Sequence, residues 1–132
     1  FEDPYFALRL LVDVALRSLG VGDPSTTIRM IDFIDDLVFQ LSERDLRVVH
    51  RDPSGRVRVV VAQRTWREYV MLGFAGISDA VWTVDVRSLE VTMYLRETLH
   101  RLVARVPPGR RSAVEAVLAR ESLSTVPSHS RR

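Results

Sequence analysis

Residues 4–19 read PYFALRLLVDVALRSL, and this stretch decides the fold. Proline is tolerated in the first turn of a helix and Asp3 is a suitable N-cap, so the stretch predicts a helix. One apolar stripe follows the helical repeat and consists of Leu8, Leu11, Val12, Ala15 and Leu19. Further apolar residues lie on the other sides, namely Phe6, Leu10, Val14 and Leu16. A helix that is apolar nearly all round is buried by its neighbours or by a partner.

The rest of the chain predicts four more helices and one β-hairpin around a single core, a mainly α fold with a small α+β element. Asp23-Pro24 begins the second helix, which reaches about residue 44. The hairpin covers about 46–61, because β-branched residues flank the turn Asp52-Pro53-Ser54-Gly55. The remaining helices are predicted at about 66–81, 84–106 and 109–121, and Thr65 with Glu68 forms a capping box before the first of them.

The domain is predicted to cover residues 1–126, with a flexible tail over 127–132 that is rich in serine, proline and arginine. The chain opens at Phe1 and runs directly into structured-looking sequence, so we expect a soluble piece excised from a larger protein. No apolar stretch approaches the roughly 20 residues that span a bilayer.

The composition excludes several kinds of chemistry. Cysteine is absent, which rules out disulfide scaffolds, thiol catalysis and cysteine-bound metals. All 19 lysine-plus-arginine positions are arginine, so lysine Schiff bases and Walker-type phosphate loops are excluded as well. The 17 carboxylates are interleaved with the arginines and leave a net charge of +2, so we expect no nucleic-acid partner.

No constellation for catalysis or for a cofactor is apparent. The histidines His50, His100 and His129 share no metal-ligand spacing. Asp32, Asp35 and Asp36 are close enough in sequence to hold a hard cation, but an ion-paired helix face explains them better. We therefore expect no catalytic residue, no metal and no cofactor.

The candidate ligand-binding residues are Arg9, Asp13, Arg17 and Asp23. The first three are four residues apart, so they form one narrow row on the first helix and can build an ionic network, either structural or facing a ligand. Asp23 belongs to the loop Gly22-Asp23-Pro24 at the start of the second helix, where free backbone N–H groups can bind an anion. The Asp23 carboxylate can instead cap those N–H groups itself.

The sequence also resembles a known family in several motifs. The pattern Phe6-x-x-Arg9-x-x-x-Asp13-x-Ala15-x-Arg17, followed by Asp23-Pro24, is similar to a bacterial family catalogued only as predicted membrane proteins, a domain of unknown function. Residues 55–61 and 69–75 fit the same family. The loop before the second helix is shorter than is usual in that family, and Gly22 stands in place of an asparagine, so a ligand contact from this loop is not implied.

The resemblance implies transmembrane helices N-terminal to this region, in the bacterial inner membrane, with this domain on the cytoplasmic side. It assigns no reaction.

Three functions remain open. The first is a non-enzymatic soluble domain of a membrane protein that binds a partner or forms a homo-oligomer, as a symmetric dimer through the first helix or the hairpin edge. The second is a sensor of a small ligand or anion that uses the Arg9, Asp13 and Arg17 row with the Gly22-Asp23-Pro24 loop. The third is an enzyme, for which an acid–base constellation is missing.

Overall fold

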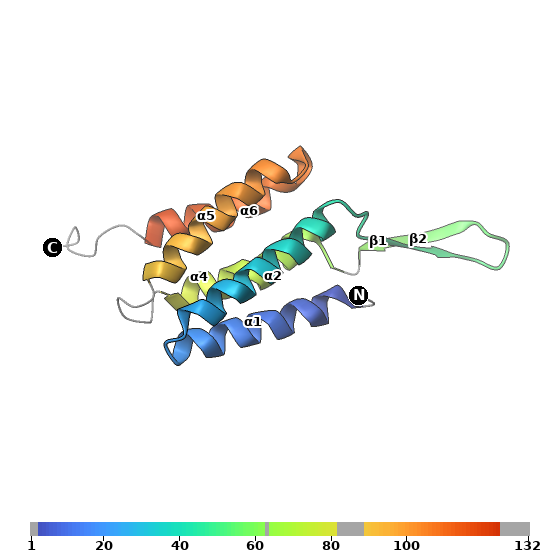
Figure 1. Ribbon diagram of the computed structural model, residues 1–132. Helices are drawn as coiled ribbons and strands as arrows, with labels where there is room; N and C mark the ends of the chain where they lie inside the picture. The colour runs from blue at the N-terminus through green and yellow to red at the C-terminus, as the bar shows by residue number, and fades with distance from the viewer. Residues whose placement is uncertain (1–2, 63, 82–88, 125–132) are drawn as a thin grey trace.

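The computed structural model describes residues 3–62, 64–81 and 89–124, and this part of the chain is mainly helical, as predicted (Figure 1). The elements in chain order are α1 (Pro4–Gly20), α2 (Pro24–Ser42), β1 (Arg47–Arg51), β2 (Val57–Ala62), α3 (Trp66–Val70), η1 (Met71–Ala75), α4 (Gly76–Val81), α5 (Leu89–Arg105), η3 (Pro108–Arg110) and α6 (Arg111–Ser124). The tail predicted at 127–132, and the first residues of the helix predicted at 84–106, lie outside the described residues.

The helices begin at the capping signals that the sequence contains. Asp3 accepts a hydrogen bond from the backbone N–H of Phe6 at 3.2 Å, and Asp23 accepts one from Thr26 at 3.2 Å. Gly22 has a φ of 73°, a left-handed conformation that glycine adopts without strain. The cap at Asp23 and the turn at Gly22 reverse the chain between α1 and α2, which lie side by side (Figure 1).

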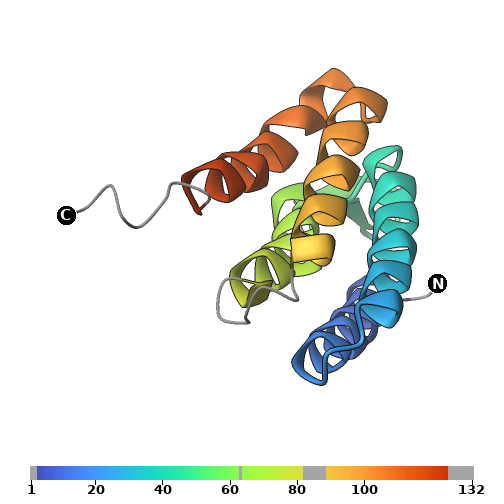
Figure 2. The same ribbon diagram turned by 60° about the vertical axis from the view of Figure 1, so that its left-hand side comes forward.

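A central rod made of α3, η1 and α4 contacts α1, α2, α5 and α6 (Figure 2). The fully buried side chains of the core come from all of these elements and include Leu8, Ile31, Ile34, Val38, Phe74, Ile77, Leu95, Leu99, Leu102 and Val114. Burial of each such side chain stabilises the fold by about 1.5–3 kcal/mol relative to exposure. The single core therefore surrounds the central rod.

The central rod departs from the uninterrupted α-helix that its sequence pattern predicts. Residues Met71–Ala75 form a π-helical turn, in which one extra residue is accommodated. Gly73 lies inside this turn, and a Cβ atom at its position would lie 3.0 Å from Cγ2 of Ile34 and 3.4 Å from Cγ2 of Val38. The missing side chain allows the backbone of the rod to approach α2 more closely than any other residue would.

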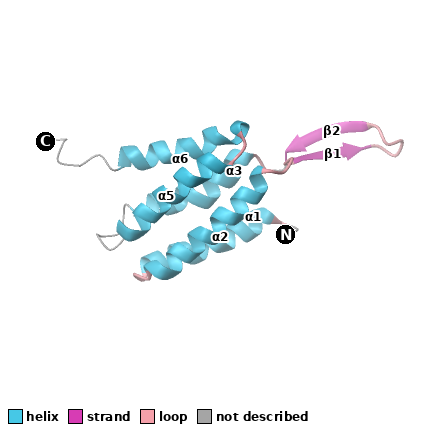
Figure 3. Ribbon diagram, turned by 45° about the horizontal axis from the view of Figure 1, so that its top comes forward, coloured by secondary structure: helices cyan, strands magenta, loops and turns pink. Residues whose placement is uncertain are grey.

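The hairpin is a two-stranded antiparallel sheet at one end of the helical bundle. Arg47 pairs with Ala62 and His50 with Val59, and a bulge lies between His50 and Arg51. Figures 1 and 3 show that the two strands project beyond the helices rather than covering them. The hairpin is thus a separate arm of the molecule.

We predict that Gly73→Ala destabilises the protein by about 1–3 kcal/mol, although alanine is the better helix former. The added methyl group would meet Ile34 and Val38, which are fully buried and have little room to move. Gly76→Ala is the matched control, because nothing lies within 4 Å of its Cβ position, and it should stabilise by about 0.5–1 kcal/mol. Urea unfolding of both variants measures the difference, and equal effects would contradict the close-contact explanation.

Candidate functional site

The side of α1 that faces away from the core carries large apolar side chains. Phe6, Leu10 and Val14 are 58%, 51% and 39% exposed, and their spacing of four residues places them on one face. The core side of the same helix buries Leu8, Val12 and Ala15. The helix is therefore apolar on most sides, as the sequence predicts. One part of this apolar surface is buried in the core, and the other part is exposed.

A groove lies between α1 and α2. Leu11 of α1 and Phe33, Asp36, Leu37 and Gln40 of α2 line an open groove of about 430 Å³. Phe33 is 49% exposed at its rim. We call Phe6, Leu10, Leu11, Val14 and Phe33 the α1 face. Exposed apolar patches of this kind mark sites of protein interaction in many soluble proteins.

The predicted row Arg9, Asp13 and Arg17 lies on the exposed side of α1. Within the described residues no hydrogen bond or ion pair joins these three side chains, so the expected ionic network is not formed. The reason is solvation, because an exposed pair at this spacing gains only about 0.3–0.5 kcal/mol over water. The row is therefore a charged border of the α1 face, and its role in ligand binding stays a prediction.

Asp23 is engaged as the cap of α2. Besides the Thr26 N–H, its carboxylate accepts a hydrogen bond of 2.6 Å from the Thr26 hydroxyl. The hydrogen bonds from Thr26 lower the pKa of Asp23 below its usual value. Beneath this loop the hydroxyls of Ser18 and Thr27 are 2.7 Å apart and buried. A negative charge thus already occupies the helix N-terminus at which an anion would bind.

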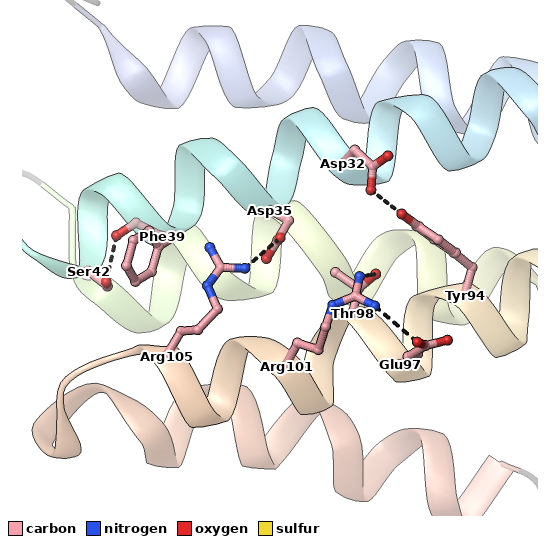
Figure 4. Close-up of polar contacts among 9 residues, drawn as sticks. All are labelled: Asp32, Asp35, Phe39, Ser42, Tyr94, Glu97, Thr98, Arg101 and Arg105. Atoms are coloured by element: carbon pink, nitrogen blue, oxygen red, sulfur yellow. Dashed lines mark hydrogen bonds and ion pairs between the residues drawn. The ribbon is translucent and has the colours of Figure 1, made fainter.

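A second polar arrangement joins α2 to α5 (Figure 4). The side chain of Asp35 is only 9% exposed and forms an ion pair with Nη1 of Arg105 at 3.1 Å. The guanidinium of Arg105 also packs over the ring of Phe39, 4.4 Å from its centre. The second carboxylate oxygen of Asp35 is buried without a hydrogen-bond partner. Burial therefore raises the pKa of Asp35, although the hydrogen bond from Arg105 acts in the opposite direction.

The same interface contains contacts that sequence reasoning missed. The hydroxyl of Tyr94 donates a hydrogen bond to Asp32, which raises the pKa of the tyrosine. Within α5 itself, Arg101 pairs with Glu97 at 3.1 Å, a local contact at the i,i+4 spacing. Tyr94 is 62 positions from Asp32 and Arg105 is 70 positions from Asp35, so no local pattern could have paired these residues. The only available signal was the position of Asp35 on the apolar side of its helix.

These contacts separate the three carboxylates that could have held a cation. Asp32 binds Tyr94, Asp35 binds Arg105, and Asp36 lines the groove beside Leu11. Among the described residues no group of three potential ligands is arranged around a metal position. The α2–α5 contacts thus serve to join two helices, and the α1 face is the stronger candidate for function.

Comparison with known proteins assigns a family but no activity. A family model described as "Predicted membrane protein (DUF2254)" matches residues 1–101. No curated protein and no solved structure gives a significant match. None of the helices within the described ranges combines the length and the hydropathy that a bilayer crossing requires.

We predict an asymmetric response when the α2–α5 ion pair is broken. Arg105→Met keeps the aliphatic packing over Phe39 but leaves the buried Asp35 carboxylate without its partner, which should cost about 1–3 kcal/mol at about pH 7. Asp35→Asn removes the buried charge and should cost less than about 1 kcal/mol, because Arg105 remains partly solvated. Equal costs for the two variants in urea unfolding would contradict this assignment.

The cost of Arg105→Met should also depend on pH. Because the pKa of Asp35 is raised in the folded protein, the folded state binds its proton more readily than the unfolded chain does. Stability from this group is therefore gained as the pH falls toward the raised pKa and lost as the pH rises through it. Unfolding measured at about pH 7 and about pH 4.5 should show a smaller loss at the lower pH. A loss that is constant with pH would show that Asp35 does not titrate in this range.

Proposed function

The chain belongs to the DUF2254 family of predicted membrane proteins, and we propose that it forms a non-enzymatic domain outside the bilayer that self-associates through the α1 face. The observation that carries this proposal is the exposed apolar stripe of Phe6, Leu10 and Val14. The core of the domain is complete without these three side chains. A partner surface would remove them from water, at a gain of about 25 cal/mol for each Å² of apolar area buried.

The charges beside the stripe favour a second copy of the same chain as the partner. Arg9 and Asp13 are four residues apart, with Leu11 midway between them in sequence. If two α1 helices pack antiparallel along the stripe of Phe6, Leu10 and Val14, with the two-fold axis at the height of residue 11, Arg9 of each copy comes level with Asp13 of the other copy at the border of the interface. Such an arrangement is a two-fold interface, in which one surface is complementary to itself. Opposite charges at its border would set the register and orientation of the two helices.

Sidedness is a further part of the proposal, and we place the domain on the cytoplasmic side of the bacterial inner membrane. The chain contains no cysteine, so one introduced cysteine reports the location of this region without background from it. Ser112→Cys is suitable because Ser112 is exposed on α6, outside the α1 face and the hairpin. In intact cells the thiol should resist a membrane-impermeant reagent and react only after lysis. Reaction in intact cells would place the domain on the other side.

We predict that Leu10→Glu weakens self-association, because a carboxylate in the centre of the α1 face would be buried without a partner. The dissociation constant of the dimer should rise at least about tenfold, as measured by light scattering or sedimentation over a range of concentrations. Met93→Glu is the matched control, since Met93 is 62% exposed on α5 and lies outside the α1 face. A wild-type chain that stays monomeric to about millimolar concentration would overturn the proposal.

The antiparallel register has its own test by charge exchange. Arg9→Asp alone and Asp13→Arg alone should each weaken the dimer, because each places like charges opposite one another. The double variant restores opposite charges and should recover most of the affinity. Both single variants keep the exposed positions polar and should leave the unfolding free energy within about 0.5 kcal/mol. If the double variant is as weak as the sum of the single ones, the copies pack in another register.

A further inference from the structure

The arm formed by β1 and β2 carries a charge opposite in sign to the rest of the chain. Residues 47–62 contain four arginines and one aspartate, a net charge of +3, whereas the whole chain has +2. The remaining residues together therefore have a net charge of −1. The arm projects from one end of the bundle (Figure 3), so the segment with this charge extends beyond the helices.

The single carboxylate of the arm is directed into the turn. Oδ1 of Asp52 accepts hydrogen bonds from the N–H of Ser54 at 3.0 Å, from the Ser54 hydroxyl at 2.6 Å and from the N–H of Arg56 at 3.0 Å. The turn is closed by Gly55, whose φ of 88° is in the left-handed region. These contacts hold the Asp52 carboxylate in the turn, and residues 47–62 keep a net charge of +3 with this carboxylate counted.

The tip of the arm combines exposed positive and apolar groups. Arg51 and Arg56 are exposed, and Val57, the first residue of β2, is 49% exposed. The guanidinium of Arg51 donates a hydrogen bond of 3.1 Å to the carbonyl of Gly55, which holds it beside the turn. The tip of the arm thus presents positive charges next to an exposed valine. This combination is complementary to a surface whose outer layer is anionic and whose deeper layer is apolar.

The residues that follow the arm contact the helical bundle. Arg64, just after β2, lies over the ring of Tyr5 in α1, 4.1 Å from its centre, and pairs with Glu68 at 3.7 Å. Thr65 and Glu68 form a reciprocal capping box at the start of α3. These contacts hold Arg64 and the start of α3 against α1, two residues after the last residue of β2.

We propose that the arm docks on the anionic surface of a lipid bilayer. An isolated two-stranded sheet is marginal in water, so a hairpin that projects from its domain is expected to meet a partner. A domain of a membrane protein is held beside a bilayer, and each arginine near an anionic leaflet adds to the attraction. Two arms of the same chain would repel each other through their like charges, which argues against a second copy as the partner.

The test is co-sedimentation of the full 132-residue chain with vesicles. Vesicles of phosphatidylcholine with about 30% phosphatidylserine should bind the chain, and vesicles of phosphatidylcholine alone should not. Arg51→Gln combined with Arg56→Gln should lower the partition coefficient at least about tenfold. Raising the salt concentration to about 0.5 M should release the wild-type chain, because the interaction is electrostatic.

The matched control is Arg29→Gln combined with Arg111→Gln, which removes the same charge from exposed positions on α2 and α6. This variant should bind within about twofold of the wild type. Equal losses for the two double variants would show that only net charge matters and would overturn the assignment to the arm. Tighter binding of a single-stranded RNA oligonucleotide than of the vesicles would overturn the lipid assignment. Leu10→Glu, which tests self-association, should still bind vesicles, so the two proposals can fail separately.

Discussion

The close approach of the central rod to α2 at Gly73 is the contact on which the rest of the structure depends. Ile34 and Val38 fill the space that a side chain at this position would occupy. This contact brings Phe74 to the centre of the core, where α1, α2, α5 and α6 all surround the same rod. Because the rod packs against the inner side of α1, the outer side of that helix is not covered by any of the described residues. The exposed α1 face is thus a consequence of how the core is centred.

Much of the fold was predictable because its signals are local. Asp3, Asp23 and the pair Thr65 and Glu68 each cap a helix within three residues of themselves, so the helix starts could be read directly from the chain. The π-helical turn was not predictable, because it reflects the space left by Ile34 and Val38 and not the propensities of residues 71–75. Periodicity alone cannot distinguish a helix that is regular from one adjusted to a neighbour.

The candidate site also has features that the sequence predicts and features that only the packing of the helices determines. An apolar surplus on α1 was evident from its sequence, but which half would be exposed depended on where the central rod packs. The row of Arg9, Asp13 and Arg17 was correctly placed on one side of the helix, yet its expected network does not form because water solvates all three groups. The ion pair of Asp35 and Arg105 joins residues 70 positions apart and becomes visible only when α2 and α5 are in contact.

The arginines interleaved with valine in the hairpin have one more consequence, which concerns solubility. Residues 57–61 read VRVVV, a sequence with high β propensity, and both strands of the two-stranded sheet have an outer edge with no pairing strand in the described residues. Such edges are templates for stacking of chains into fibrils, and charged residues along them are a common protection. The net charge of +3 on residues 47–62 opposes such pairing between the hairpins of two chains. A partner that neutralises the arginines removes the charge that opposes pairing of strand edges between chains. Such a partner therefore has to cover the exposed edges of β1 and β2 itself if the chains are to stay apart.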